Sequence, residues 1–272
     1  MPAPGICCRS TAFSIVSATI SAVAAATLTG WAGDAGRPLL SVIIPALEVD
    51  TELRRCLDSV RLALPDPRQC EIVLVLPARH LSAAAQAFPG TRILVESRPS
   101  VYGAMNDGVT ASTGRFLYFL GKDDIVLPSI REVVQLLVAE APAIVFADVY
   151  WGSDGVRSSR SSRWGILLRN VCHQGIVYSR EAVIQHGPYV RRFRVRADHL
   201  LNIRVLWDAS LRVRSRQIRV PLAWYAATGL SFNLPDRNFY RVQATIIRRY
   251  AGPLAACAWR AYKCLRPEKG ML

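Results

Sequence analysis

Two adjacent carboxylates, Asp123 and Asp124, follow the apolar run Arg115-Phe-Leu-Tyr-Phe-Leu120 after only Gly121 and Lys122. The run predicts a buried strand, and ligands of open α/β sheets bind beyond the carboxyl ends of the strands. Two carboxylates at such a point repel each other unless a cation or hydrogen-bond donors compensate them. A divalent metal that carries a diphosphate meets this need, because Mg²⁺ takes one or two protein carboxylates plus phosphate oxygens. The alternative is a surface turn in which an Asp caps the next helix.

The elements that position this pair follow from the hydrophobic pattern. Continuous apolar runs are typical of strands buried on both faces of a parallel sheet, and they occur at 39–45, 71–76, 92–95, 115–120 and 143–150. Segments with helical character lie between them, at 50–64, 81–88, 102–112 and 128–140. This alternation predicts an α/β fold with a mostly parallel sheet flanked by helices.

The second half of the chain is less regular. It predicts a strand at 175–178, a helix at 197–208, one or two strands within 211–226, and a mainly helical basic stretch from Pro235 to about Arg266. The segment 151–163, rich in Ser, Arg and Gly, is interpreted as a mobile loop.

The cysteines and the N-terminus limit the cellular setting. The seven cysteines form no C-x-x-C pair, which favours reduced cytosolic thiols over a disulfide framework or a zinc site. Cys172, beside His173, leaves a cysteine nucleophile open as an alternative. The uncharged stretch 11–32 is consistent with a signal peptide or signal anchor, or with an extension before the folded domain, which we expect to begin near Leu39.

Several motifs in order resemble family-2 glycosyltransferases of the GT-A fold. The most specific is Ser100-Val-Tyr-Gly-Ala-Met-Asn-Asp-Gly108, followed by Ala111-Ser-Thr-Gly114 and the strand that ends in the acidic pair. The weaker matches share the family's order along the chain; they are Leu40-Ser-Val-Ile-Ile-Pro45, Leu57-Asp-Ser-Val60, His173-Gln-Gly175, Ala197-Asp-His199 and Gly229-Leu-Ser231. The resemblance covers about residues 39–235. Within the family, the sequence resembles enzymes that build bacterial surface polysaccharides.

The resemblance implies a Rossmann-like GT-A domain that binds a nucleotide-sugar donor and a divalent metal, Mg²⁺ or Mn²⁺. By position it makes Asp124 the metal ligand and Asp198 the general base of an inverting, single-displacement transfer to a hydroxyl acceptor. It also implies donor contacts, from Asp123, Tyr102, Asn106, His173 and Gln174. For Asp198 the alternative is a carboxylate that stabilises a helix N-terminus. For His173 the alternative is a core histidine bonded to the backbone.

The chain departs from the family pattern after its second predicted strand. Relatives carry there an Asp that helps to read the base or the ribose, whereas Leu76-Pro-Ala-Arg-His80 has no carboxylate. Gly103 likewise stands where relatives have an Asp. These losses keep open the hypothesis of a degenerate, non-catalytic member of the same fold.

The charge divides the chain. The net charge of +14 is made of −2 over residues 1–149 and +16 over residues 150–272. So basic a half is compatible with nucleic-acid binding, but no zinc spacing or other recognisable binding motif supports it. We therefore expect a nucleotide-sugar-binding half at 39–150, an acceptor-side half at 151–234, and a basic amphipathic tail at 235–272 after the extension 1–38. The tail predicts either contact with an anionic membrane surface or a solvated helix face. The predicted protein is cytoplasmic, or peripheral at the inner membrane face, with a saccharide or lipid-linked acceptor.

Overall fold

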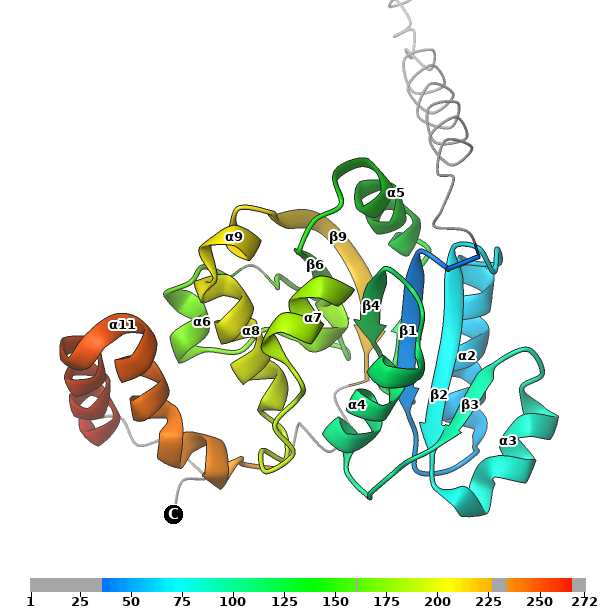
Figure 1. Cartoon of the computed structure of the whole chain (residues 1–272), viewed down its shortest axis with the longest axis horizontal. Coiled ribbons are helices and arrows are strands. Elements are labelled where there is room, and N and C mark those ends of the chain that lie inside the picture. Colours follow the sequence, from blue (N-terminus) through cyan, green and yellow to red (C-terminus); the bar gives the residue numbers. More distant parts are fainter. Residues whose placement is uncertain (1–35, 160, 227–233, 266–272) are drawn as a thin grey trace, which may run out of the picture.

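A computed structural model describes residues 36–159, 161–226 and 234–265 (Figure 1). The strands in chain order are β1 (Leu40–Pro45), β2 (Cys70–Leu76), β3 (Arg92–Val95), β4 (Phe116–Phe119), β5 (Ile125–Val126), β6 (Ile144–Trp151), β7 (Val156–Arg157), β8 (Ile176–Ser179) and β9 (Ser215–Tyr225). The helices are α2 (Thr51–Ala63), α3 (Leu81–Ala87), α4 (Val101–Ala111), α5 (Ile130–Glu140), α6 (Gly165–Leu168), α7 (Arg180–His186), α8 (Ala197–Trp207), α9 (Ala209–Arg212) and α11 (Arg237–Leu265), with single 3₁₀ turns at Ala78–His80 and His173–Gly175.

One sheet runs through the described chain, in the order β3-β2-β1-β4-β8-β6-β9-β5, with β7 paired to β6. The first four of these strands are parallel to one another, as the apolar runs predict. β8 is antiparallel to both of its neighbours, β4 and β6, whereas β6 and β9 are again parallel. The predicted boundary at residue 150 falls inside β6, so the two halves share a single sheet and their division stays a prediction about function.

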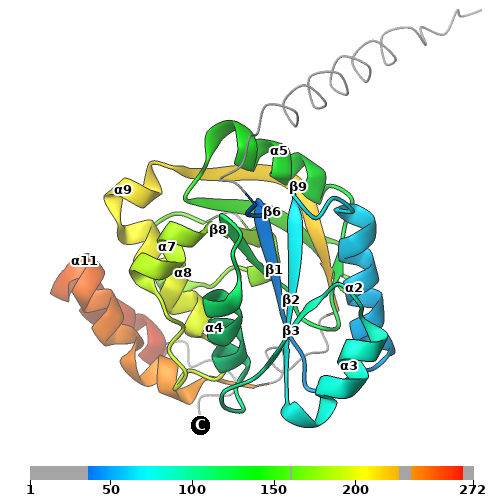
Figure 2. The same cartoon turned by 45° about the vertical axis from the view of Figure 1, so that its right-hand side comes forward.

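Helices cover both faces of the sheet (Figure 2). One face packs against the apolar sides of α2, α3 and α5, through residues such as Leu57, Ala84 and Val133. The other packs against α4, α8 and the first part of α11, through residues such as Met105, Leu201 and Phe239. This three-layer α/β arrangement confirms the predicted fold class. In this arrangement the carboxyl ends of the strands and the first turns of several helices lie close together at one edge of the sheet.

Caps explain several helix boundaries. Asp50 begins α2 by accepting a hydrogen bond from Leu53 N–H, and Ser100 does the same for α4 through Gly103 N–H. Gly108 on α4 faces β1 so closely that a Cβ there would overlap the Ile43 side chain, which fixes how near this helix lies to the sheet.

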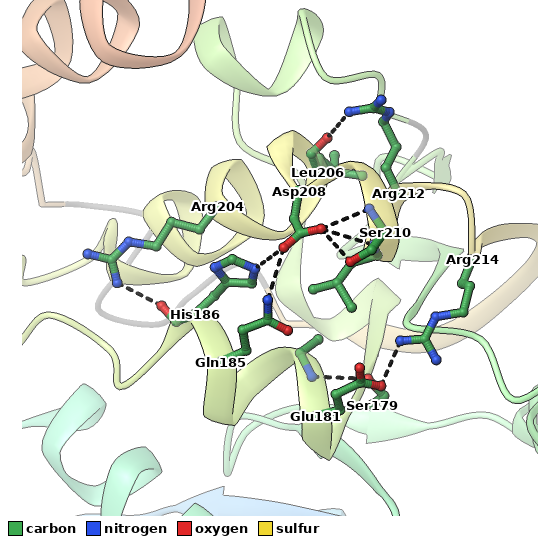
Figure 3. A network of polar contacts seen from close by, with 12 residues as sticks. Ser179, Glu181, Gln185, His186, Arg204, Leu206, Asp208, Ser210, Arg212 and Arg214 are labelled. Carbon is green, nitrogen blue, oxygen red and sulfur yellow. Dashed lines mark hydrogen bonds and ion pairs between the residues drawn. The ribbon is translucent and has the colours of Figure 1, made fainter.

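Asp208 joins α7, α8 and α9 in the second half of the chain (Figure 3). Its carboxylate caps α9 by accepting hydrogen bonds from Ser210 and Leu211, and it also contacts Gln185 and His186 at the end of α7. These donors, led by the Ser210 hydroxyl, lower the pKa of Asp208 to about 2. The cap explains why residues 209–212 are helical although the pattern predicts strand from 211, and it ties α8, which ends at Trp207, to its neighbours.

The C-terminal stretch is helical as predicted, and its first part packs against the rest of the chain. α11 bends at Gly252, whose φ of 87° lies in the left-handed region that favours glycine. Before the bend Phe239, Ile246 and Ile247 are buried in the core; beyond it Leu254 and Leu265 are exposed. Residues 1–35 and Gly229-Leu-Ser231 lie outside the described residues. Within the described ranges, no helix combines the length and the apolarity needed to cross a membrane.

Candidate active site

A cavity of about 1040 Å³ opens where the carboxyl ends of β1, β3 and β4 meet the second half of the chain. Ala46 and Leu47 border it from β1, Glu96 from β3, and Lys122 and Asp123 from β4. Of the residues predicted to carry the chemistry, five lie in its wall: Tyr102, Asp123, His173, Gln174 and Asp198. Asn106 and Asp124 lie outside the set of lining residues.

The two carboxylates of the acidic pair have different surroundings. Asp124 is fully buried and accepts hydrogen bonds from Gln174 Nε2 at 2.6 Å, from Gly121 N–H at 3.1 Å and from Ala226 N–H at 3.1 Å. Burial, and then the negative charge of Asp123, raise the pKa of Asp124 to about 7. Asp124 thus ties the end of β4 to the end of β9, whereas Asp123 faces the cavity.

Gly121 explains how the pair can be so close. A Cβ at this position would lie 2.6 Å from Asp124 Oδ2 and 2.9 Å from Asp123 Oδ1, so any larger residue would push the carboxylates apart. Both carboxylates therefore converge on the small space above Gly121. This convergence of negative charge is the kind of setting that a cation or a cluster of donors stabilises.

The 3₁₀ turn at His173–Gly175 presents the predicted polar pair. Tyr118 on β4 holds this turn by donating its hydroxyl to Gln174 O at 2.8 Å. The Gln174 side chain donates a hydrogen bond to Asp124, so it stabilises the buried member of the acidic pair. His173 Nε2 is buried without a hydrogen-bond partner among the described residues, and burial lowers the pKa of this imidazole, so the neutral form is favoured. An orphaned ring nitrogen in the cavity wall is available to a ligand.

Asp198 lies in the first turn of α8 with both carboxylate oxygens engaged. Tyr102 donates its hydroxyl to Oδ1 at 2.9 Å, and Asn170 Nδ2 donates to Oδ2 at 2.6 Å. Asn170 is itself held by Asn202 Nδ2 at 3.1 Å, and Tyr178 donates to Asn202 Oδ1 at 2.6 Å. Asp198 is thus a fixed, hydrogen-bonded carboxylate whose remaining lone pairs can accept one more donor from the cavity.

Asn106 does not line the cavity and instead contacts the backbone of Tyr189. Its amide donates to Tyr189 O at 3.0 Å and accepts from Tyr189 N–H at 2.8 Å, so both ends of the side chain are used. Asn106 therefore braces α4 against the loop that leads to Asp198, and a contact with the donor stays a prediction. The Tyr189 ring packs on Tyr102 with centroids 5.2 Å apart, which ties this brace to the tyrosine that holds Asp198.

The residues present fit a metal bound together with a phosphate ligand, but not a site made of protein alone. Within the described ranges no three or more His, Cys, Asp and Glu side chains gather as a metal site. A Mg²⁺ or Mn²⁺ ion that shares its shell with a diphosphate needs only one or two carboxylates. The cavity-facing Asp123, with Asp124 close behind it, supplies that set.

The structure also adds two positioning residues that the sequence motifs missed. Asn170, which holds Asp198, lies in an irregular stretch between α6 and the 3₁₀ turn, where neither periodicity nor a family motif marks it. Lys122 forms an ion pair with Asp50, and its Nζ lies 3.0 Å from Glu48 Oε1 and 3.5 Å from Glu52 Oε2. Hydrogen bonds and charges from these acids raise the pKa of Lys122 well above its ordinary value. The lysine thereby fixes the end of β4 to the start of α2.

Comparisons with known proteins agree with this arrangement. The family model described as "Glycosyl transferase family 2" matches residues 41–200. A "PGL/p-HBAD biosynthesis glycosyltransferase" of Mycobacterium bovis is 33% identical over 222 residues, which are 75% of this chain and 83% of the relative. A protein of the same description from Mycobacterium tuberculosis matches equally well.

Solved structures show the same fold at low sequence identity. S. aureus TarS 1–349 in complex with UDP-GlcNAc has a TM-score of 0.62 and 13% identity, over 78% of this chain and 67% of the TarS chain. The mannosyltransferase PcManGT from Pyrobaculum calidifontis, in complex with GDP-Man and Mn²⁺, has a TM-score of 0.52 and 15% identity, over 94% of this chain and 87% of the other. At these identities the likeness concerns the fold.

Proposed function

The chain belongs to glycosyl transferase family 2, and from this membership we propose that its cavity transfers a sugar from a nucleotide-sugar donor to a hydroxyl of a saccharide or lipid-linked acceptor, with inversion. The observation that carries the proposal is the meeting of two carboxylates in one cavity wall, Asp123 at the end of β4 and Asp198 at the start of α8. The glycolipid pathway named for the mycobacterial relatives supports a polysaccharide or glycolipid product.

We assign the metal-facing role to Asp123 and a supporting role to Asp124, which exchanges the roles expected from position alone. Asp124 is buried and already accepts three hydrogen bonds, whereas Asp123 lines the cavity. A divalent ion here, Mg²⁺ or Mn²⁺, would stabilise the negative charge that develops on the leaving diphosphate. The Mn²⁺ named for the mannosyltransferase neighbour supports this cofactor class.

Asp198 is proposed as the general base. As the acceptor oxygen forms its bond to the anomeric carbon, the bond from that carbon to the diphosphate oxygen breaks, and the acceptor proton passes to Asp198. Tyr102 and Asn170 fix the direction of the carboxylate, because each donates a hydrogen bond to one of its oxygens. His173 remains a proposed donor contact through its Nε2, which has no partner in the part of the chain that the structure describes.

The proposal is tested by a screen of UDP- and GDP-sugars for Mn²⁺-dependent binding and turnover. We expect Asp123→Asn to lose metal-dependent nucleotide binding, and Asp198→Asn to bind nucleotide normally while transfer falls. Glu132→Gln, an exposed carboxylate on α5, is the matched control. Full transfer by Asp198→Asn would contradict the base assignment. A wild-type protein that no nucleoside diphosphate stabilises against heat would instead favour a non-catalytic protein of this fold.

A peripheral position at an anionic membrane is the finer proposal for its location. α11 contains six Arg and Lys residues and no Asp or Glu. Beyond its bend Leu254 and Leu265 are 86% and 83% exposed. Basic and apolar side chains together suit an anionic lipid surface. In a flotation assay with anionic vesicles, the full chain should float with the vesicles and a chain truncated after Ala251 should not. Truncation after Asp236 is unsuitable because it removes the buried Phe239. Equal flotation of both chains would exclude this role for the helix, and binding to nucleic acid in place of vesicles would favour the alternative.

A further inference from the structure

The carboxylate that the sequence lacks after β2 is supplied by the neighbouring strand. Residues 77–80, which follow β2, contribute nothing to the cavity wall and contain no Asp or Glu. Glu96 directly follows β3, and its backbone N–H donates to Leu76 O at 2.9 Å. This bond continues the pairing of Leu76 with Val95 by one residue, so Glu96 lies beside the last residue of β2.

Glu96 is also placed to meet a ligand. It lines the cavity and is half-buried, and its carboxylate makes no hydrogen bond or ion pair with the described residues. Ala46, Leu47 and Val101 add apolar surface to the wall of the same cavity. Most other described carboxylates have a partner on the protein, as Asp50 has Lys122 and Glu71 has Ser41. A half-buried carboxylate beside an apolar wall is suited to accept N–H or O–H groups from a flat, partly apolar ligand.

The position of Glu96 along the sheet edge fits one end of a nucleotide. β3 and β4 are separated by β2 and β1, so their ends lie about 14 Å apart at the usual strand spacing. A nucleoside diphosphate laid across these strand ends would reach from Glu96 to Asp123. The cavity wall then offers three carboxylates for three parts of the reactants: Glu96 for the nucleoside, Asp123 for the diphosphate and its metal, and Asp198 for the acceptor.

We propose that Glu96 recognises the nucleoside part of the donor, by accepting hydrogen bonds from ribose hydroxyls or from an N–H of the base. The inference rests on the proposed nucleotide-sugar chemistry and adds the residue that reads the nucleoside. It makes Glu96 a specificity residue in a place where the chain's own β2 loop has none.

The test is calorimetric titration of the full chain with UDP, GDP, 2′-deoxy-UDP and inorganic pyrophosphate, each with Mn²⁺. We expect Glu96→Gln to weaken the preferred nucleoside diphosphate by about 10- to 100-fold, the loss of a hydrogen bond to a charged acceptor, and to leave pyrophosphate affinity unchanged. Glu132→Gln, which removes an exposed carboxylate on α5 that has no partner among the described residues, should change neither affinity. A preference for UDP over 2′-deoxy-UDP that Glu96→Gln abolishes would identify the ribose as the partner; equal binding of the two would identify the base.

Two results would overturn the inference. Nucleoside diphosphate affinity in Glu96→Gln within twofold of the control would show that the carboxylate does not contact the nucleoside. An equal loss of pyrophosphate affinity would show that it acts on the diphosphate or the metal instead. A wild-type chain that binds pyrophosphate and Mn²⁺ but no nucleoside diphosphate would contradict the proposed function itself, and so the two failures are distinguishable.

Discussion

Removal of one hydroxyl next to Asp198 should slow transfer without weakening nucleotide binding. In Tyr102→Phe the ring remains packed against Tyr189, and only the 2.9 Å hydrogen bond to Asp198 Oδ1 is lost. A hydrogen bond to a charged group contributes about 1.5–3 kcal/mol. If Asp198 acts as the base and this bond holds it in place, kcat should fall by about 10- to 150-fold.

The assay is metal-dependent sugar transfer, with nucleotide affinity measured in parallel. Tyr189→Phe is the matched control, because it removes a hydroxyl from the adjacent buried ring and that hydroxyl makes no hydrogen bond to the described residues. A double-mutant cycle sharpens the test, since Tyr102→Phe should cost less than about twofold once Asp198→Asn has removed the carboxylate.

Two outcomes would refute this account. Transfer by Tyr102→Phe within threefold of Tyr189→Phe would show that the hydroxyl does not assist Asp198. A loss of nucleotide affinity with unchanged kcat would instead support the direct donor contact that the family resemblance implies for Tyr102.

Three further outcomes follow from the described contacts. The Asp124 carboxyl has its ordinary pKa of 3.8 in the unfolded chain but a pKa of about 7 in the folded protein, so the free energy of unfolding should fall as pH rises through this interval. Asp124→Asn should reduce this fall, measured by urea unfolding at pH 5 and 7.5. The same fall in the wild type and the variant would contradict the pKa shift. Gly121→Ala, whose Cβ would meet both carboxylates of the pair, should abolish Mn²⁺-dependent nucleotide binding in calorimetry, whereas unchanged binding would show that the pair tolerates separation. Gly108→Ala should lower the free energy of unfolding by about 1–3 kcal/mol because its Cβ would overlap Ile43, and a chemical denaturation midpoint equal to wild type would contradict that close approach.

Much of the fold and the presence of the site could be predicted from local pattern. Buried strands such as Cys70–Leu76 and Ile144–Trp151 are continuous apolar runs, and α2 has a one-sided apolar stripe, because burial on both faces or on one face leaves its own period in the sequence. The acidic pair at the end of β4 and Asp198 at the start of α8 were likewise identifiable, since their place at an element's end is a local property.

The tertiary structure decided which of these residues meets the cavity. Asp123 and Asp124 are adjacent at a turn after β4, and no local pattern tells which of the two is buried and which lines the cavity. Partners far along the chain made that choice: Gln174 and Ala226 hold Asp124 inside the protein. The place of β8 between β4 and β6 was equally open, because strand order depends on pairing between distant segments.

The same reason explains the residues that the sequence concealed. Asn170 holds Asp198 from an irregular segment 28 positions away, and Glu96 lies beside the end of β2 only because β3 pairs with that strand. The sequence by itself determined the elements, the acidic pair and the family. Contacts between segments remote in the chain determined which carboxylate is buried and which lines the cavity, because a side chain's surroundings are set by the partners that folding brings to it.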